Sequence, residues 1–364
     1  MTNTPKWEES DDPIQNHTKN LKLLEARNYS WIMILVLFGI FKACETRSSG
    51  ILLIGVISQP LSKNLKKKCG NREEYQSYVA NSYSSYISQT GSIPVLIPWD
   101  SPYDQLVILL DSIDMILLPG GGSHLRTKNK DQTTSYMRSI DFIIHYIIFL
   151  NRIQKKYVPL VATCLGMEQL IISFSNMKAT ELDSGFDDVK KYPKMTLIKR
   201  EMNRSGYWKG SKGWYKQLHR LFTGRMFYFY HNDGKGFASY KKDEVLKENF
   251  RVTSLGHPKN GKVFLSTMEH YSLPFYANMF HPEKHQFERN PYYKDMVRSN
   301  ELTRFIALKL IKLVSKVKEK RGEQLRTTKD LPKWILNDFS PLGRHSVNCG
   351  IKSYERIFPF PKYN

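Results

Sequence analysis

The sequence predicts an α/β protein with a doubly wound, mostly parallel sheet that is flanked by helices and built as a single domain. From residue 51 onward, short apolar runs that suit buried strands alternate with helical patterns. No internal repeat interrupts this alternation. With 364 residues, 41% of them hydrophobic, the chain is long enough for one large core or two smaller ones. One domain is the simpler expectation.

The elements of the first half follow in order. From Ile51, the continuous apolar run ILLIGVI predicts a central strand that is covered on both faces. A helix is predicted in EYQSYVANSYSSYISQTG and ends at Gly91, and the next strand is predicted in SIPVLIP. YDQLVILLDSI predicts a helix, and DMILLPGGG predicts a strand followed by three glycines. A long helix from about Thr133 to Lys155 then leads to a strand in YVPLVAT and a helix in LGMEQLII.

The second half begins less regularly. Residues 175–254 mix lysine, glycine and aromatic residues and predict an inserted, loop-rich subregion. KVFLSTMEH and LPFYANMF then predict a pair of strands, with His281 at the end of the second. The stretch ELTRFIALKLIKLVSKV has apolar residues at helical spacing, so we expect an amphipathic helix that packs on the sheet. We expect the aromatic tail from Asp330 onward to pack on the body.

Residues 1–49 predict an N-terminal extension. Its apolar segment WIMILVLFGIF, residues 31–41, is too short to span a bilayer but suits the core of a signal peptide. The thirty polar residues before it are atypical of a signal, whereas a start at Met33 gives a compact one. The alternatives are a buried strand and an amphipathic anchor. A signal peptide implies the secretory pathway, with lysosome, vacuole and extracellular space equally open, and no stable membrane span.

Charge and cysteine content limit the function classes. A formal net charge of +21 suits nucleic acid, an anionic substrate or a lysine-rich lineage. The densest basic run, Lys66 to Lys68, has no aromatic neighbours, so we interpret it as a solvated loop and expect no nucleic-acid binding. Cys44, Cys69, Cys164 and Cys349 are widely spaced without a CxxC pattern, which argues against a structural metal site. A disulfide between Cys69 and Cys349 is compatible with secretion, but the sequence does not establish it.

Cys164 lies at the predicted junction between a strand and a helix. A cysteine there faces the carboxyl edge of the sheet, where helix N–H groups lower a thiol pKa and stabilise a developing oxyanion. A buried cysteine without chemical function is the alternative, since free cysteine is among the most buried residue types.

Two further stretches suggest a site. LLPGGG, residues 117–122, lets the backbone approach a ligand closely at a strand end, although a tight turn would use the same glycines. FHPEK places Glu283 two residues after His281, where a carboxylate can orient an imidazole base. The chain has ten histidines, so a structural role for His281 is the alternative.

Together, ATCLGMEQL, LLPGG and STMEHYSLPFYANMFHPEK resemble the gamma-glutamyl hydrolase family of the class I glutamine amidotransferase-like superfamily. IGVISQP, YVANSYSSYISQTGSIPVLIP and the FSP of residues 339–341 extend the resemblance, which implies a catalytic domain over residues 50–364. The resemblance implies that Cys164 is the nucleophile, His281 the general base and acid, and Glu283 the group that orients His281. It also implies an oxyanion hole of the backbone N–H groups of Gly120, Gly121 and Leu165, and a substrate contact at His231.

The implied activity is cleavage of gamma-glutamyl isopeptide bonds, as in folylpoly-gamma-glutamates, through a thioester and without a metal or organic cofactor. The implied partner is an anionic poly-gamma-glutamyl substrate, and assembly as a homodimer stays open. Ser85 stands where relatives often carry lysine, and residues 175–254 match the family poorly, so substrate preference is open as well. The alternatives are hydrolysis of small gamma-glutamyl amides, an activity of the glutamine amidotransferase type, and a non-catalytic binding protein of the same fold.

Overall fold

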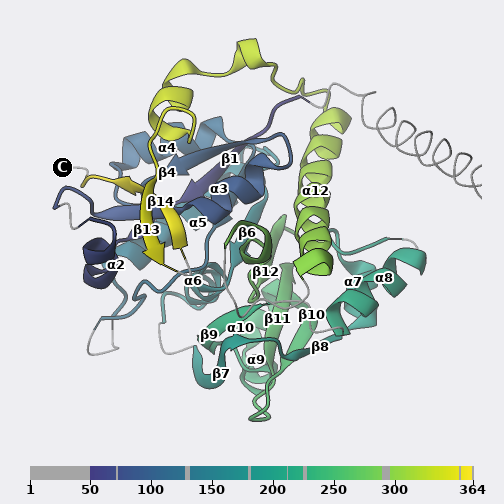
Figure 1. Cartoon of the computed structure of the whole chain (residues 1–364). Helices are drawn as coiled ribbons and strands as arrows, with labels where there is room; N and C mark the ends of the chain where they lie inside the picture. The colour runs from purple at the N-terminus through teal and green to yellow at the C-terminus, as the bar shows by residue number, and fades with distance from the viewer. Residues whose placement is uncertain are drawn as a thin grey trace, which may run out of the picture. The chain divides into compact units, whose positions relative to one another are not determined.

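A mixed sheet forms the centre of the computed structural model, which describes residues 50–70, 73–127, 132–178, 182–210, 212–223, 228–288, 296–351 and 354–362 (Figure 1). Within these residues the sheet has eight strands in the order β4-β1-β5-β6-β12-β11-β10-β8. The bounds are β4 Ile93–Ile97, β1 Leu53–Ile57, β5 Met115–Leu118, β6 Leu160–Thr163, β12 Phe275–Asn278, β11 Phe264–His270, β10 Phe250–His257 and β8 Lys194–Leu197.

The first five strands of this order are parallel, and the last three pair antiparallel. All five residues of β1 are buried, as expected of a central strand covered on both faces. The predicted strand pair after residue 262 is confirmed by β11 and β12, which are antiparallel neighbours. The predicted fold class, a mostly parallel sheet flanked by helices, is therefore confirmed.

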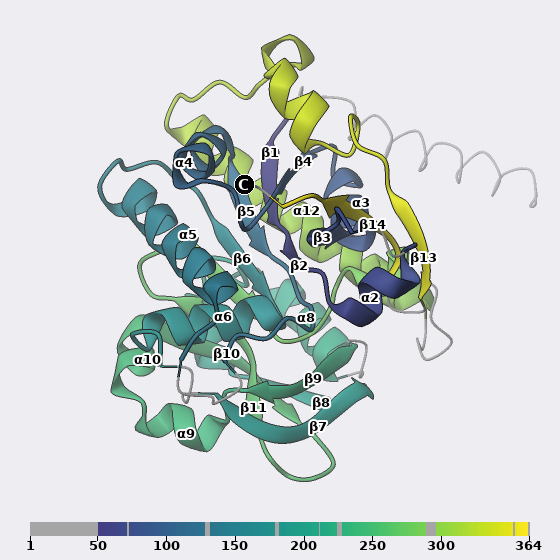
Figure 2. The same cartoon turned by 90° about the vertical axis from the view of Figure 1, so that its left-hand side faces the viewer.

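Helices pack in two groups on this sheet. One group contains α4 (Tyr103–Ser112), α5 (Ser135–Arg152) and α6 (Leu165–Phe174), and the other contains α3 (Asn81–Ser88), α11 (Lys284–Phe287) and α12 (Met296–Lys320). Figure 2 shows the sheet between them. The amphipathic pattern of α12 is confirmed, since Ile306, Leu310 and Val314 are buried.

A second, four-stranded sheet corrects one helix prediction. Residues 74–91 do not form one helix, because Ser77–Ala80 form strand β3 before α3 begins at Asn81. β3 pairs with β14 (Tyr354–Phe360) and with the short β2 (Gln59–Pro60), and β13 (Val347–Ile351) completes this sheet. The strand conformation thus depends on pairing with the distant C-terminal tail, which packs on the body as expected.

Residues 175–254 are more regular than a loop-rich insertion. They contain β7 (Asp183–Lys191) and β9 (Phe229–Gly234), which form a two-stranded sheet, and the strands β8 and β10 of the main sheet. Their helices are α7 Lys199–Arg204, α8 Lys212–Thr223, α9 Phe237–Lys242 and α10 Glu244–Asn249. The region therefore contributes strands β8 and β10 to the main sheet and is not only a surface insertion.

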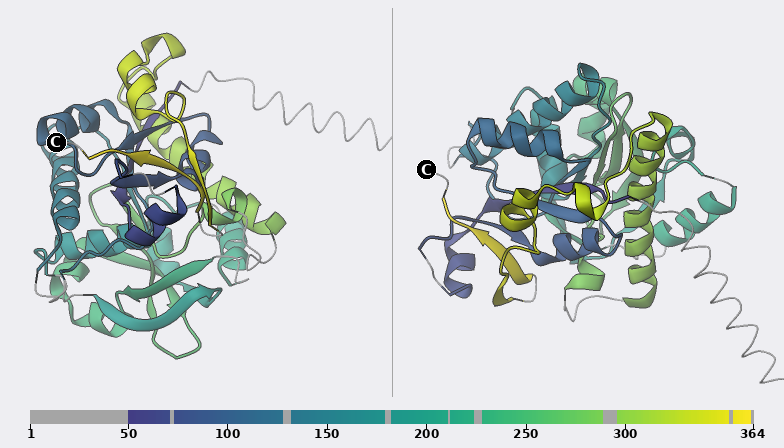
Figure 3. Two further views of the ribbon diagram at one scale, coloured as in Figure 1. Left: turned by 60° about the vertical axis from the view of Figure 1, so that its left-hand side comes forward. Right: turned by 90° about the horizontal axis from the view of Figure 1, so that it is seen from above.

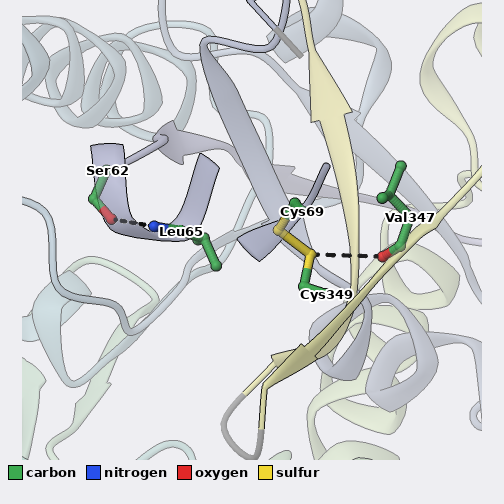
Figure 4. Close-up of a disulfide and its surroundings, with 5 residues drawn as sticks. All are labelled: Ser62, Leu65, Cys69, Val347 and Cys349. Atoms are coloured by element: carbon green, nitrogen blue, oxygen red, sulfur yellow. Dashed lines mark hydrogen bonds between the residues drawn. A yellow bond between two sulfur atoms is a disulfide. The ribbon is translucent and has the colours of Figure 1, made fainter. Parts of the chain in front are cut away.

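The Cys69–Cys349 disulfide is formed and joins two segments that are 280 residues apart. Cys69 follows helix α2 (Lys63–Lys68), and Cys349 lies on β13, so the bond holds α2 beside the C-terminal strands (Figures 3 and 4).

Residues 50–364 form one compact unit. The predicted signal segment at 31–41 and Met33 lie outside the described residues. In the described part of the chain, no helix combines the length and the apolar character needed to cross a membrane.

Candidate active site

Cys164 occupies a sharp turn between β6 and α6. Its backbone has φ 50° and ψ −107°, a conformation that residues other than glycine rarely adopt and that often marks a functional site. Gly166 allows the turn, because a Cβ there would lie 2.3 Å from the Leu118 carbonyl oxygen of the neighbouring strand β5. The geometry is that of a nucleophile elbow, which presents a side chain at the carboxyl edge of a sheet.

The register of β12 brings His281 to the same edge. β12 lies parallel to β6 with Asn278 opposite Thr163, and the Cys164 N–H donates to the Asn278 carbonyl at 2.7 Å. Three residues further on, the His281 N–H donates to the Tyr228 carbonyl at 2.9 Å, which holds the backbone of His281 in place. Residues that are 117 positions apart in sequence therefore meet at one edge.

His281 and Glu283 form a buried pair. The distance from His281 Nδ1 to Glu283 Oε1 is 2.7 Å, and the two side chains are 4% and 0% exposed. When Nδ1 carries the proton that this bond uses, Nε2 is the free base of the ring. Burial alone would raise the pKa of Glu283, but His281 and Lys284 hold it below its usual value, so Glu283 is an anion.

Gly120 lies next to both Cys164 and His281. A methyl group on Gly120 would lie 2.5 Å from His281 Cε1 and 3.0 Å from Cys164 Cβ. The ring of His281 and the side chain of Cys164 therefore flank the same glycine, and only a residue without a side chain fits between them.

The direction of the Cys164 pKa differs from the sequence expectation of a lowered value. Burial raises the pKa of the thiol well above its usual value, and the charges of Glu168 and Glu283 add to this. A hydrogen bond from the Leu165 N–H and the Lys284 charge act in the opposite direction but do not prevail. Burial also lowers the pKa of His281, against the effect of Glu283. At neutral pH the site thus holds a thiol beside a neutral imidazole.

The three predicted oxyanion donors have different surroundings in the structure. The Gly120 N–H donates to the Tyr83 hydroxyl at 2.6 Å and the Leu165 N–H donates to Cys164, so an oxyanion would replace these two partners. Gly121 lines the cavity at the site, and the Leu165 N–H follows the nucleophile at the start of α6. All three N–H groups therefore stay predicted oxyanion donors.

Three polar residues around the site were not assigned a role from the sequence. Tyr83, on α3, is buried, and burial and the charges of Glu283 and Cys164 raise its pKa, so its hydroxyl keeps its proton. Gln59 Nε2 donates to the Gly120 carbonyl at 2.8 Å. Burial and the charge of Asp233 raise the pKa of Glu168 to about 8. All three lie within stretches quoted above for the resemblance, but their roles depend on contacts between distant segments, which the sequence does not show.

His231 lies on β9, and its register partner on the neighbouring strand β7 is Asp188. Its side chain is outside the described part of the structure, so the predicted substrate contact stays a prediction.

A cavity of about 670 Å³ opens beside the site, which is within the usual size range of ligand pockets. Gly121, Gly122, His281 and Lys284 line it on the catalytic side, and residues of β2, α2 and α5 complete the wall. Among the described residues, no group of three or more His, Cys, Asp and Glu side chains is arranged to hold a metal ion. The arrangement supplies a nucleophile, a base oriented by a carboxylate, backbone donors and space for a ligand, which suits acyl transfer.

Comparisons with known proteins agree with this chemistry. The family model described as Peptidase C26 matches residues 52–200, which include Cys164 but not His281. Gamma-glutamyl hydrolase of Mus musculus is 30% identical over 237 residues, which cover 65% of this chain and 68% of the mouse protein. Gamma-glutamyl hydrolase of Rattus norvegicus is 28% identical over 251 residues, covering 66% and 70%. Gamma-glutamyl hydrolase B of Dictyostelium discoideum is 25% identical over 233 residues, and the chain spans 62% of its length.

Proposed function

The chain belongs to the gamma-glutamyl hydrolase family, a hydrolase family of the glutamine amidotransferase-like superfamily, and from this membership we propose that it cleaves gamma-glutamyl isopeptide bonds with Cys164 as nucleophile. The observation that carries the proposal is the convergence of Cys164 and the His281–Glu283 pair around Gly120. These groups come from two strand ends that the sequence separates widely.

The proposed reaction starts from a neutral thiol and a neutral imidazole. His281 Nε2 takes the thiol proton while Cys164 Sγ attacks the gamma-carbonyl carbon, and Glu283 stabilises the imidazolium. The predicted backbone N–H donors bind the tetrahedral oxyanion; removing one such donor typically costs about 10²–10³ in rate. His281 then protonates the leaving amine, and a water molecule that His281 deprotonates hydrolyses the thioester. The cycle returns the thiol and the imidazole.

The proposed substrate is a folylpoly-gamma-glutamate, whose tail carries one carboxylate per residue. The lining of the cavity supports an anionic ligand, because its described residues include Lys68 and His124, and Lys284 paired with Glu288, but no aspartate or glutamate. The net charge of +21 acts in the same direction by raising the local concentration of anions.

The proposed location is the secretory pathway, with delivery to a lysosome, a vacuole or the extracellular space. The Cys69–Cys349 disulfide supports this, since such bonds persist in oxidising compartments and are rare in the cytosol. Assembly as a homodimer stays a prediction.

The test is a cleavage assay on pteroylpentaglutamate, with products resolved by chromatography and the Cys164→Ala protein run in parallel. We expect shortened tails from the wild type and none from the variant, and the product ladder distinguishes endo from exo cleavage. Equal cleavage by both proteins would refute the role of Cys164. If the folded wild type does not cleave pteroylpentaglutamate but hydrolyses small gamma-glutamyl amides, these amides replace folylpoly-gamma-glutamates as the proposed substrate class. If the wild type hydrolyses neither substrate, a non-catalytic binding protein becomes the better hypothesis.

A further inference from the structure

The basic run Lys66–Lys68 is part of a helix at the rim of the catalytic cavity. The sequence suggested a solvated loop, but these lysines form the last turn of α2. Leu61, Ser62, Asn64, Leu65 and Lys68 of this segment line the cavity, which also contains His281 of the proposed triad. The run therefore borders the site where a substrate would lie.

The three lysines of this run differ in their contacts and in whether they line the cavity. Asn64 and Lys68 are four residues apart, so both lie on the side of α2 that lines the cavity. Lys66 Nζ donates to the Glu73 carbonyl at 2.7 Å, and Lys67 is exposed and does not line the cavity. Lys68 is thus the one lysine of the run that lines the cavity.

The charges within the cavity leave Lys68 available to an anion. Lys284 also lines the cavity, but its Nζ is compensated by Glu288, with distances of 3.1 and 2.9 Å to the two carboxylate oxygens. Both members of this pair are buried. Lys68 is exposed and makes no ion pair with an aspartate or glutamate in the described part of the chain.

Both ends of α2 are held in place. At its start, the Ser62 hydroxyl accepts a hydrogen bond from the Leu65 N–H at 3.2 Å (Figure 4). At its end, Cys69 is bonded to Cys349 of β13. A charge on an element fixed in this way loses less conformational freedom on binding than a lysine on a mobile loop.

We propose that the Lys68 face of α2 is a binding subsite for the carboxylates of gamma-glutamyl residues that extend beyond the scissile bond. This inference rests on the proposed function, which supplies the ligand class. The short gamma-glutamyl unit at Cys164 does not need the subsite, whereas a longer tail reaches the rim and gains an ionic contact. The chain should therefore bind long tails more tightly than short ones.

The test measures binding by calorimetry, with every protein carrying Cys164→Ala so that no ligand is cleaved. The ligands are di-gamma-glutamate and penta-gamma-glutamate. The Lys68→Gln variant is compared with Lys67→Gln, which removes the same charge from the same helix outside the cavity. Each is measured at low salt and in 1 M NaCl, where exposed charges are screened.

We expect Lys68→Gln to weaken binding of the pentaglutamate by roughly two- to fivefold at low salt, as for a partly exposed ion pair, and to leave the diglutamate unchanged. Lys67→Gln should match the parent, and high salt should remove the difference. Equal effects of the two substitutions, or equal effects on the two ligands, would overturn the subsite. If the wild type cleaves the pentaglutamate but Lys68→Gln shows no tail-length effect, the subsite fails and the proposed function stands. If the Cys164→Ala parent binds neither ligand, the subsite fails, and the cleavage assay on pteroylpentaglutamate decides the proposed function separately.

Discussion

At the scale of single residues, burial decides the protonation states of the candidate site. Cys164 and His281 are both nearly inaccessible, and burial disfavours the charged form of each, which raises one pKa and lowers the other. The pair is therefore neutral before substrate arrives. In the proposed mechanism, activation then depends on proton transfer during attack instead of on a preformed thiolate, so small displacements between the two side chains should have large consequences.

Gly120→Ala tests this dependence on position. The added methyl group would lie 2.5 Å from His281 Cε1, 2.9 Å from the Tyr83 hydroxyl and 3.0 Å from Cys164 Cβ, so one of these groups has to move. Because a displacement of about 1 Å at a reacting centre costs on the order of 10²-fold in rate, we expect kcat to fall by about that factor while the far-UV spectrum stays native. Steady-state kinetics on the cleaved substrate measures the loss.

Gly122→Ala is the matched control, since a Cβ at Gly122 meets no atom within 4 Å. It should keep kcat within about threefold of the wild type, because nothing near the reacting atoms is displaced. A Gly120→Ala enzyme with wild-type kcat would show that the convergence around Gly120 is not needed for turnover.

At the scale of elements, two long-range connections build the walls of the site. The parallel pairing of β12 with β6 places His281 beside Cys164, and the pairing of β3 with β14 fixes the start of α3, which carries Tyr83. The disulfide adds a third connection between α2 and β13. Each of these joins parts of the chain that are far apart in sequence, so none is stabilised by local structure alone.

Replacing both disulfide cysteines, Cys69→Ser with Cys349→Ser, should lower the free energy of unfolding by about 2–4 kcal/mol. The bond closes a loop of 280 residues, so its loss frees a large part of the unfolded chain. Denaturant unfolding of the oxidised wild type and the double variant measures the difference. Wild type treated with a reductant should match the double variant, and an unchanged unfolding midpoint would contradict a stabilising role for the bond.

At the scale of the whole molecule, buried carboxyl groups couple stability to pH. The pKa of Glu168 is about 8 in the folded protein and about 4.3 in an unfolded chain. Between these values the folded chain keeps a proton that the unfolded chain has lost, so stability falls as the pH rises. His270 and His285, whose pKa values burial lowers to about 4, have the opposite effect, but only up to about pH 6.5, where they lose their protons in the unfolded chain.

We therefore expect the free energy of unfolding to decrease between pH 7 and 8, by at most about 1.4 kcal/mol per pH unit for this one proton. Urea unfolding at several pH values across this window measures the slope. Glu168→Gln keeps the size of the side chain without the titration and should reduce the slope, leaving the opposed contributions of Glu288, whose pKa burial raises to about 7, and Lys309, whose pKa burial lowers to about 8. A wild-type protein whose stability is constant or rises over this range would show that Glu168 does not retain its proton there.

Local sequence patterns were enough to predict the alternation of strands and helices, the place of Cys164 at a strand–helix junction and the closeness of Glu283 to His281. These features are local: hydrophobic periodicity marks buried strands and helices, and two residues separated by a proline are close in any fold. The same local patterns predicted the amphipathic helix that became α12.

Which segments meet could not be predicted from local patterns. Residues 77–80 are a strand instead of part of a helix because β14 and β2 pair with them, and a local pattern does not contain its distant partner. The use of the Gly120 N–H by Tyr83, and the place of Lys68 at the cavity, likewise depend on contacts between remote segments. The raised pKa of Cys164 follows from burial among neighbouring carboxylates, a property of the folded core that no spacing of residues reveals.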